Sequence, residues 1–488
     1  MSVKTAASWA ALAQYVGFAL QFASSVIVAR FFLGPAEVGV FSLAFSAAAM
    51  IHGLQDFGLN RSIIGAPRMT RRIVRQSFSV SLVVGIGIAI AILLLAAPLA
   101  RLYGNPDLFA ITALIGVSFV FIPFTVVPLA LAQRDMDFRA YALVDIGANI
   151  VTVGATLLTA WLGFSSLSLA FGILAYQSSR ALFAQFVRPI WRVLPPSWRG
   201  TAGLFRYGLS ASALSLTGSI GSRAPDLVIG KLIGEAALGL YSRATGLALQ
   251  FRMLVGGPVA SVLYPSLARA KDRGESLGPL YLRLTAALCA ITWAAMAGLA
   301  VAAEPLINTL YGPRWLGAAP VLSWVALAQV FFIALPMQIE VGYLLGRWQR
   351  VIGLTMADAV ISVGLMLLTA PYGLIWVAMS RVVHGLIWWV IHAAFVQGLV
   401  GFSWRELLTL YAKTALAAFA AVVPLLVSYT LWRPAIETPL AALALLAGAG
   451  VALWYTTLLA VRHPSAADLA DVALGKLRGW RLRRVPTR

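Results

Sequence analysis

Fourteen long apolar stretches run through this chain of 488 residues, and their length limits its fold more than any other feature. Each is about 20 residues or longer, the length that an α-helix needs to cross the hydrocarbon core of a membrane. A β-barrel is built from short segments of alternating hydropathy, and this sequence has none of that pattern. The stretches run approximately from 6 to 29, 38 to 58, 77 to 100, 108 to 132, 141 to 163, 167 to 187, 207 to 230, 237 to 262, 280 to 303, 317 to 345, 351 to 371, 374 to 397, 409 to 431 and 438 to 460.

The charge distribution predicts how the chain lies in a membrane. Only 11% of the residues are charged, against roughly a quarter in soluble domains, so a soluble fold is excluded. Connections on the side where the chain begins hold 27 basic and 7 acidic residues, which gives the whole net charge of +20. Lysine and arginine resist translocation, so this side and both termini are expected in the cytoplasm. The basic residues border the predicted spans, which favours contact with anionic lipids at the cytoplasmic face over binding of nucleic acid.

The chain repeats itself at a spacing of about 200 residues. Residues 34–44 read GPAEVGVFSLA and residues 234–244 read GEAALGLYSRA, so glycine, alanine and serine recur in register. Later matches follow in the same order: 102–104 recurs at 310–312, and Pro123, Arg134 and Asp145 recur as Pro336, Arg347 and Asp358. Each copy holds six predicted spans, an even number, so both copies enter the membrane with the same orientation.

We therefore predict an all-α polytopic membrane protein of about 14 transmembrane helices, with two parallel six-helix lobes around a central cavity. Prolines within the predicted spans, such as Pro123 and Pro336, are expected to break or weaken the helices there. Apolar residues at helical spacing among arginines predict that the end of the chain lies on the inner leaflet. The expected parts are an N-terminal lobe at 1–200, a C-terminal lobe at 201–400, two appended helices at 401–461 and a basic amphipathic tail at 462–488.

No motif in the chain points to an enzyme or a cofactor. The sequence contains no P-loop, no CxxC or HExxH pattern, no cluster of histidines at metal-ligand spacing and no arrangement that suggests a nucleophilic triad. The one cysteine, Cys289, lies in the ninth predicted span and has no partner for an internal disulfide. We therefore expect no enzymatic activity, no cofactor and no metal site.

Ten ionisable residues lie inside the predicted spans, and their charges cancel as a set. Placing a charge at the centre of a membrane costs about 2.5 to 3.5 kcal/mol, so we expect these side chains to face a wet cavity or one another. Arginine carries forked donors that suit phosphate and carboxylate groups. The ten are Arg180, Arg223, Arg243, Arg252, Arg381, Asp56, Asp145, Asp226, Glu340 and Asp358.

Helical spacing sorts some of these residues. Gln21 lies on a polar face of the first span, which we place against the cavity. Arg243 shares a face with Gln250, whereas Arg252 lies half a turn away, so only one of the two arginines faces the cavity in a straight helix. In the twelfth span, a stripe of Arg381, His384, Trp388 and His392 predicts either a site for an anion and a sugar or a packed face with buried histidines.

The acidic residues inside the predicted spans also allow two interpretations of their role. Asp226 lies three residues after Arg223, and the two can neutralise each other on one helix face. Asp145 and Asp358 begin equivalent spans near the cytoplasmic surface. They are expected either to cap a helix or pair with Arg134 and Arg347, or to carry a coupling ion.

Four segments of the chain together resemble the Wzx-type polysaccharide transporters of the multidrug/oligosaccharidyl-lipid/polysaccharide exporter superfamily. They are IVARFFLGPAEVGVFSLAFS at 27–46, GLYSRATGLAL at 239–249, VLYPSLAR at 262–269 and LYGPRWLGAAPVL at 310–322. The resemblance implies a flippase that moves undecaprenyl-diphosphate-linked oligosaccharide from the inner to the outer leaflet of the bacterial cytoplasmic membrane by alternating access. It also implies a cationic cavity, which maps onto Arg243, Arg180, Arg223 and Arg381.

The expected site adds Arg252, Gln250, Trp388 and Gln21 to those arginines as substrate-binding residues. Asp226, Glu340, Asp145 and Asp358 are the candidates for a coupling ion or a gate. A polysaccharide polymerase and chain-length machinery are expected as partners in the same pathway. Two alternatives stay open: a multidrug or cation antiporter, which should favour acidic cavity residues, and a flippase for a lipid-linked peptidoglycan precursor. A polymerase or ligase would need a long periplasmic loop, which the sequence lacks.

Overall fold

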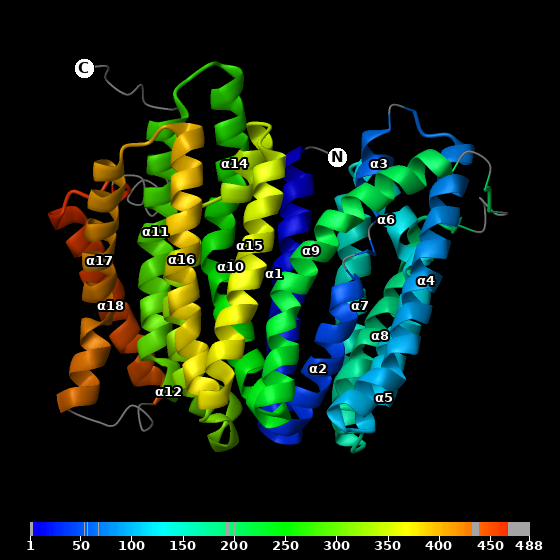
Figure 1. Ribbon diagram of the computed structural model, residues 1–488, viewed down its shortest axis with the longest axis horizontal. Coiled ribbons are helices and arrows are strands. Elements are labelled where there is room, and N and C mark those ends of the chain that lie inside the picture. The colour runs from blue at the N-terminus through cyan, green and yellow to red at the C-terminus, as the bar shows by residue number, and fades with distance from the viewer. Residues whose placement is uncertain are drawn as a thin grey trace. The chain divides into compact units, whose positions relative to one another are not determined.

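The computed structural model describes residues 3–52, 54–55, 57–66, 68–190, 196–198, 201–431 and 439–466, and these residues form helices and turns without a β-strand. Figure 1 shows the helices along the chain. The first half contains α1 (Val3–Ile27), the π-helical turn η1 (Val28–Phe32), α2 (Pro35–His52), α3 (Leu59–Gly65), α4 (Arg71–Tyr103), α5 (Asp107–Ser118), α6 (Pro123–Arg134), α7 (Phe138–Trp161), α8 (Leu167–Val187) and α9 (Ala202–Leu232). The second half contains α10 (Glu235–Asp272), α11 (Leu277–Val301), α12 (Ala303–Tyr311), α13 (Ala318–Ala334), α14 (Gln338–Leu344), α15 (Trp348–Thr369), α16 (Leu374–Val400), α17 (Trp404–Leu431) and α18 (Leu440–Ala460).

Every predicted apolar stretch overlaps a helix or a pair of broken helices, although the second stretch was predicted to run past the end of α2 at His52. Within the described residues, ten segments are long and apolar enough to cross a membrane, and the bent pair α5–α6 would make an eleventh. The other three stretches form α8, α9 and α10, in which charged residues such as Arg180, Arg223 and Arg252 lower the mean hydropathy. A polytopic all-α membrane protein is therefore confirmed, and the number of fourteen spans stays a prediction.

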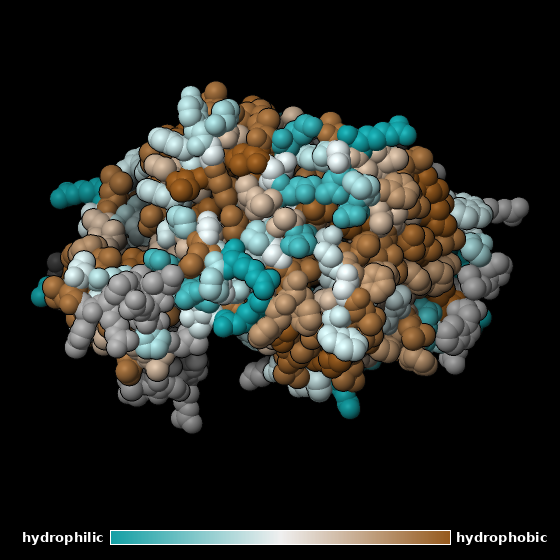
Figure 2. Space-filling model, turned by 90° about the horizontal axis from the view of Figure 1, so that it is seen from below, coloured by the Kyte–Doolittle hydropathy of each residue, from teal (hydrophilic) through white to brown (hydrophobic). Residues whose placement is uncertain are grey.

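The surface carries the apolar side chains that lipid would cover. Figure 2 looks onto the ends of the helices, where hydrophobic areas are interrupted by hydrophilic residues. Large apolar side chains such as Leu94, Val360 and Leu445 are more than 70% exposed. Exposed large apolar side chains in such number are expected where a chain contacts lipid.

Two of the predicted spans are broken at prolines. Helices α5 and α6 meet at a bend of 46°, and α6 begins at Pro123. Pro336 lies between α13 and α14, whereas α17 continues through Pro424. Proline has no backbone N–H and clashes with the preceding turn, so Pro123 and Pro336 favour the breaks beside them.

The chain divides into two compact units. Unit 1 comprises Met1–Ser242, Leu310–Gly317 and Thr355–Val377, and unit 2 comprises Arg243–Thr309, Ala318–Leu354 and Ala378–Arg488. In unit 1, α7 packs on α8 and on α1, and α2 packs on α9; in unit 2, α11 packs on α13 and α17, and α17 packs on α18. The predicted lobe boundaries at residues 200 and 400 stay predictions. Asp56 and the predicted surface helix of the tail lie outside the described residues, apart from the first residues of the tail, 462–466.

The repeat reappears in unit 1 as a reciprocal crossing of α2 and the start of α10. A Cβ atom added to Gly39 would overlap the carbonyl oxygen of the first residue of α10, and one added to Gly239 would overlap that of the first residue of α2. The hydroxyls of Ser42 and Ser242 lie 2.9 Å apart and share a hydrogen bond. At this crossing, residues that match at a spacing of 200 therefore contact each other, as expected where two related copies meet.

Two further contacts join the repeats near the same crossing. Tyr103 OH at the end of α4 donates to the carbonyl of Leu227 in α9, at 3.0 Å. Trp315 is fully buried, and its Nε1 donates to the carbonyl of Ala29 in η1, at 2.9 Å. Each repeat thus reaches the end of the first predicted span of the other repeat from the end of its own third predicted span or from the residues that follow it. These contacts lie beside the predicted periplasmic connections, where basic and acidic residues balance.

A buried histidine ties the end of α18 to α17 in unit 2. His463 is 3% exposed, and its Nε2 lies 3.0 Å from Thr414 Oγ1. Burial, with a smaller contribution from the positive charge of Lys413, lowers the pKa of His463 from 6.5 to about 4. The folded protein therefore keeps this ring neutral in a pH range where the unfolded chain protonates it.

We expect acid to weaken this end of the molecule. The free energy of unfolding should fall as the pH drops from 6.5 towards 4, by at most about 1.4 kcal/mol per pH unit, because the unfolded state binds one more proton. Thermal unfolding in detergent on either side of pH 6.5 measures the loss. The variant His463→Gln should show a shallower pH dependence, and a slope as steep as that of the wild type would contradict the assignment.

Candidate functional site

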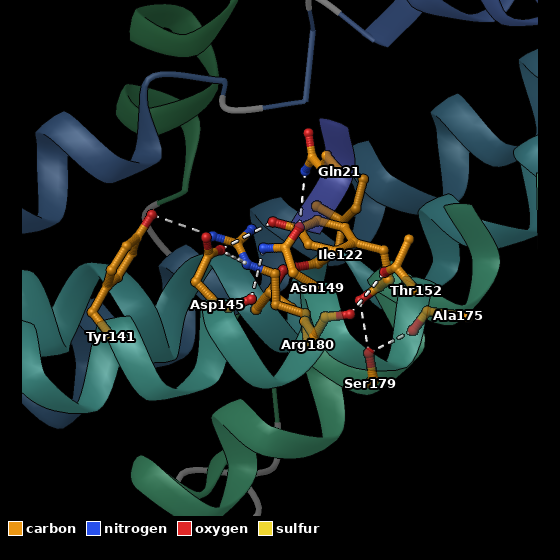
Figure 3. A network of polar contacts seen from close by, with 12 residues as sticks. Gln21, Ile122, Tyr141, Asp145, Asn149, Thr152, Ala175, Ser179 and Arg180 are labelled. Carbon is orange, nitrogen blue, oxygen red and sulfur yellow. Dashed lines mark hydrogen bonds and ion pairs between the residues drawn. The ribbon is translucent and has the colours of Figure 1, made fainter. Parts of the chain in front are cut away.

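An ion pair lies inside the α7–α8 hairpin of unit 1. Arg180 Nε of α8 is 3.2 Å from Asp145 Oδ1 of α7, and the two side chains are 18% and 21% exposed. Tyr176 OH donates to the same Asp145 oxygen at 3.0 Å, and Arg180 Nη2 donates to Tyr141 OH at 3.3 Å. The guanidinium also lies over both tyrosine rings, 5.6 and 6.0 Å from their centroids. Figure 3 shows Tyr141, Asp145 and Arg180 converging between the two helices.

The pair points away from lipid. The most exposed apolar residues of α7, including Leu143 and Ile150, and those of α8, including Leu182 and Phe186, are more than half exposed. At 3.6 residues per turn, they lie on the opposite side of each helix from the ion pair. The charged groups are therefore placed as the cost of charge in hydrocarbon requires.

Helix α1 joins this network through an amide pair. Gln21 Nε2 donates to Asn149 Oδ1 at 2.9 Å, and Asn149 Nδ2 donates to the carbonyl of Asp145 at 2.8 Å. Asn149 is 2% exposed, and Figure 3 shows it between Gln21 and the ion pair. The structure thus brings together three residues predicted from the sequence, Gln21, Asp145 and Arg180.

The predicted pairing of Asp145 with Arg134 is wrong. Asp145 lies two turns inside α7, whose N-cap is Asp137, and its partner is Arg180. Arg134 Nη1 instead donates to three backbone carbonyls near the end of α3, those of Ile63, Ile64 and Ala66. The last carbonyls of a helix lack partners within the helix, and a cation there satisfies them.

A second polar group connects α2 and α9 in unit 1. Asp226 Oδ2 accepts a hydrogen bond from Ser46 Oγ at 2.6 Å and lies 3.9 Å from Arg223 Nη1. The Arg223 guanidinium also lies 5.2 Å from the ring centroid of Phe45. The expected neutralisation of Arg223 by Asp226 is therefore present. The hydrogen bond from Ser46 to Asp226, however, was not predicted from the sequence.

Unit 2 holds the other predicted arginines. Arg252 Nη1 of α10 donates to Gln329 Oε1 of α13 at 3.1 Å. Arg381 of α16 lies over the ring of Phe332, 5.4 Å from its centroid. Arg243 and Gln250 are partly buried in α10, Glu340 is exposed on α14, and Asp358 is partly buried on α15 in unit 1.

The stripe on α16 is packed in this structure. Trp388 is 6% exposed, its ring stacks on His392 at 4.5 Å, and Phe332 meets it edge-on at 5.5 Å. His384 is 3% exposed and also contacts Phe332. These contacts favour the packing alternative for Trp388, and its role as a sugar-binding residue stays a prediction.

Sequence reasoning missed the residues that hold the ion pair in place. Tyr141 and Tyr176 each precede a charged residue by four positions, which stacks them on the same helix face. Asn149 follows Asp145 at the same interval. This spacing was the available signal for the network. Among the described residues, no three histidine, cysteine or acidic side chains come together as a metal site would require.

The chain resembles curated proteins of polysaccharide export. It is 26% identical over 479 residues to the succinoglycan biosynthesis transport protein ExoT of Rhizobium meliloti, covering 94% of this chain and 92% of that protein. It is 24% identical over 319 residues to the lipopolysaccharide biosynthesis protein WzxC of Escherichia coli. That match spans 65% of each chain, slightly less than two thirds of WzxC.

A solved structure shares the fold of this chain, and a family model matches part of its sequence. A solved structure of the lipid II flippase MurJ in an inward closed conformation matches 95% of this chain and 99% of that chain, with a TM-score of 0.75 and 12% identity, which shows a common fold. A family model described as polysaccharide biosynthesis protein matches residues 27–320. That region is well over half of the chain, so the protein belongs to the polysaccharide biosynthesis protein family.

Proposed function

We propose that this protein moves an undecaprenyl-diphosphate-linked oligosaccharide, a repeat unit of exopolysaccharide, O-antigen or capsule, from the inner to the outer leaflet of the bacterial cytoplasmic membrane. The observation that carries the proposal is Arg180, a cation within a transmembrane hairpin that points away from lipid and is paired with Asp145. Membership of the family and the names of ExoT and WzxC support the substrate class.

The substrate explains why a cation is needed inside the membrane. A saccharide head with a diphosphate cannot cross hydrocarbon unaided, because its polar groups would lose water without gaining other partners. Arginines supply those partners to the diphosphate with charge-assisted hydrogen bonds. The polyprenyl tail stays in lipid throughout. We assign the binding role to Arg180, with Arg223, Arg243, Arg252 and Arg381 as the further cations and Gln21, Gln250 and Trp388 as neutral contacts.

Transport would proceed by alternating access between the two repeats. The reciprocal crossing of α2 and α10 is the closed seam on the periplasmic side, and both termini are cytoplasmic. The candidates for a coupling ion or a gate remain Asp145, Asp226, Glu340 and Asp358. In this proposal, the chain is divided into the predicted N-terminal lobe at 1–200 and the predicted C-terminal lobe at 201–400. The helices at 401–461 are an appendix, and a polymerase and chain-length machinery act on the product.

The fold similarity to MurJ favours one alternative, a flippase for a lipid-linked peptidoglycan precursor. The two functions differ in their consequences for the cell. Loss of a peptidoglycan-precursor flippase stops growth, whereas loss of a polysaccharide flippase removes surface polymer alone. A drug antiporter of the same superfamily would instead change drug susceptibility and leave the polymer intact.

Deletion of the gene tests the proposal, and Arg180→Gln tests its central residue. We expect the deletion strain to grow, to lose its surface polymer and to accumulate lipid-linked repeat units. Complementation with Arg180→Gln should restore about a tenth of the polymer or less, because a lost charged hydrogen bond weakens binding roughly tenfold or more. The matched variant Arg188→Gln, which breaks an exposed ion pair with Asp135, should restore it fully. Normal polymer in the deletion strain would refute the function.

A further inference from the structure

The ion pair of Arg180 and Asp145 is incomplete. Arg180 Nε is buried and donates no hydrogen bond to any described residue, although it lies 3.2 Å from Asp145 Oδ1. That oxygen instead accepts the hydrogen bond from Tyr176 OH. A buried donor left without an acceptor is costly, so the guanidinium has capacity for a better partner than the one it has.

Building on the proposed function, we propose that Asp145 is an internal counter-ion that occupies Arg180 until the diphosphate of the substrate replaces it. An arginine inside the membrane needs compensation even when no substrate is bound. A carboxylate provides it, and Asp145 Oδ1 lies 3.2 Å from the Nε to which a phosphate oxygen would bind. Asp145 is therefore a positioning residue that stands in for the substrate in the empty site.

The surrounding contacts allow this exchange without disturbing the fold. Tyr176 OH continues to donate to Asp145 when Arg180 turns away, and Asn149 holds the Asp145 backbone through its carbonyl. The rings of Tyr141 and Tyr176 lie beside the guanidinium in the present state and do not depend on Asp145 for this contact. A diphosphate offers more acceptor oxygens than one carboxylate and can satisfy Arg180 Nε as well.

Competition of this kind limits affinity and promotes release. Binding of the diphosphate has to displace Asp145 from Arg180, so part of the binding free energy is lost to breaking the resting pair. When the head group is released on the other side of the membrane, Asp145 pairs with Arg180 again. A site without the counter-ion would bind more tightly and turn over more slowly.

The variant Asp145→Asn isolates this effect because asparagine keeps the shape of the side chain and an oxygen for Tyr176. The full-length protein in lipid nanodiscs is titrated with undecaprenyl diphosphate, with undecaprenol as the uncharged control. We expect Asp145→Asn to bind undecaprenyl diphosphate about tenfold more tightly than the wild type and to translocate more slowly. Arg180→Gln should bind it about tenfold more weakly. The double variant should bind no more tightly than Arg180→Gln, since the gain depends on a free guanidinium.

Two controls distinguish a failure of the counter-ion proposal from a failure of the proposed function. Asp135→Asn changes a carboxylate to an amide in the exposed ion pair with Arg188 and should leave the affinity unchanged. Thermal unfolding checks that each variant folds. If the wild type prefers undecaprenyl diphosphate to undecaprenol but Asp145→Asn binds it no more tightly, the pair is structural and the counter-ion role is overturned. If the wild type shows no such preference, the proposed function itself fails.

Discussion

A disulfide between Ser42→Cys and Ser242→Cys should stop transport, and reduction should restore it. The two hydroxyl oxygens are 2.9 Å apart where α2 crosses the start of α10, within reach of a disulfide between the two positions. In the proposed cycle, opening of the predicted periplasmic side separates these helices, so the crosslink would hold the protein in its present state. The native Cys289 is fully buried and is replaced by alanine in every variant. Surface polymer, measured before and after reduction of cells, should fall at least about tenfold when oxidised.

A second disulfide within one repeat provides the control. A Cβ atom at Gly172 in α8 would lie 3.5 Å from the Cβ of Thr156 in α7, which fits the geometry of a disulfide. This pair lies within one hairpin, so the crosslink of Gly172→Cys and Thr156→Cys should leave transport intact. Full transport by the oxidised 42–242 protein would mean that this seam does not open during the cycle.

Replacing Gly39 with alanine should destabilise the protein severely. The added Cβ would overlap a backbone carbonyl of α10, and a backbone atom cannot move aside as the end of a flexible side chain can. Overpacking of a close contact costs about 1 to 3 kcal/mol or more, so the melting temperature in detergent should fall by several degrees. The same substitution at Gly239 should have a matching effect, because the crossing is reciprocal.

The control for this experiment is a glycine with free space around it. Gly154 in α7 has no atom within 4 Å of an added Cβ, so Gly154→Ala should keep the abundance and melting temperature of the wild type. A Gly39→Ala protein as stable as Gly154→Ala would contradict the close crossing of α2 and α10.

The sequence predicted the helices well because the requirement for them is local. A span needs a run of apolar residues, and a proline removes a helix hydrogen bond, which favours the breaks beside Pro123 and Pro336. Charged helices were harder to count as spans. In α8 and α10, the same arginines that suggest function also lower the hydropathy on which the assignment of a span depends.

The pairing of charged side chains needed the structure. Arg134 and Asp145 lie eleven residues apart on separate helices, and the sequence contains nothing that says which of several cations lies opposite Asp145. Packing of α8 against α7 decides it in favour of Arg180. The internal repeat was recognisable in the sequence because identical residues recur at a spacing of about 200. The contacts of Gly39 with the start of α10 and of Ser42 with Ser242 depend on how the two helices cross. The spacing of matched residues in the sequence does not determine that crossing.

Translocation in proteoliposomes tests the central claim most directly. Purified protein is reconstituted with undecaprenyl-diphosphate-linked oligosaccharide, and the fraction of head groups accessible to an added glycosidase is followed over time. The account predicts that wild-type protein accelerates the movement of head groups between leaflets, and that Arg180→Gln and the oxidised 42–242 crosslink do so at least about tenfold more slowly. Movement at the rate of protein-free liposomes in the presence of the wild type would contradict it.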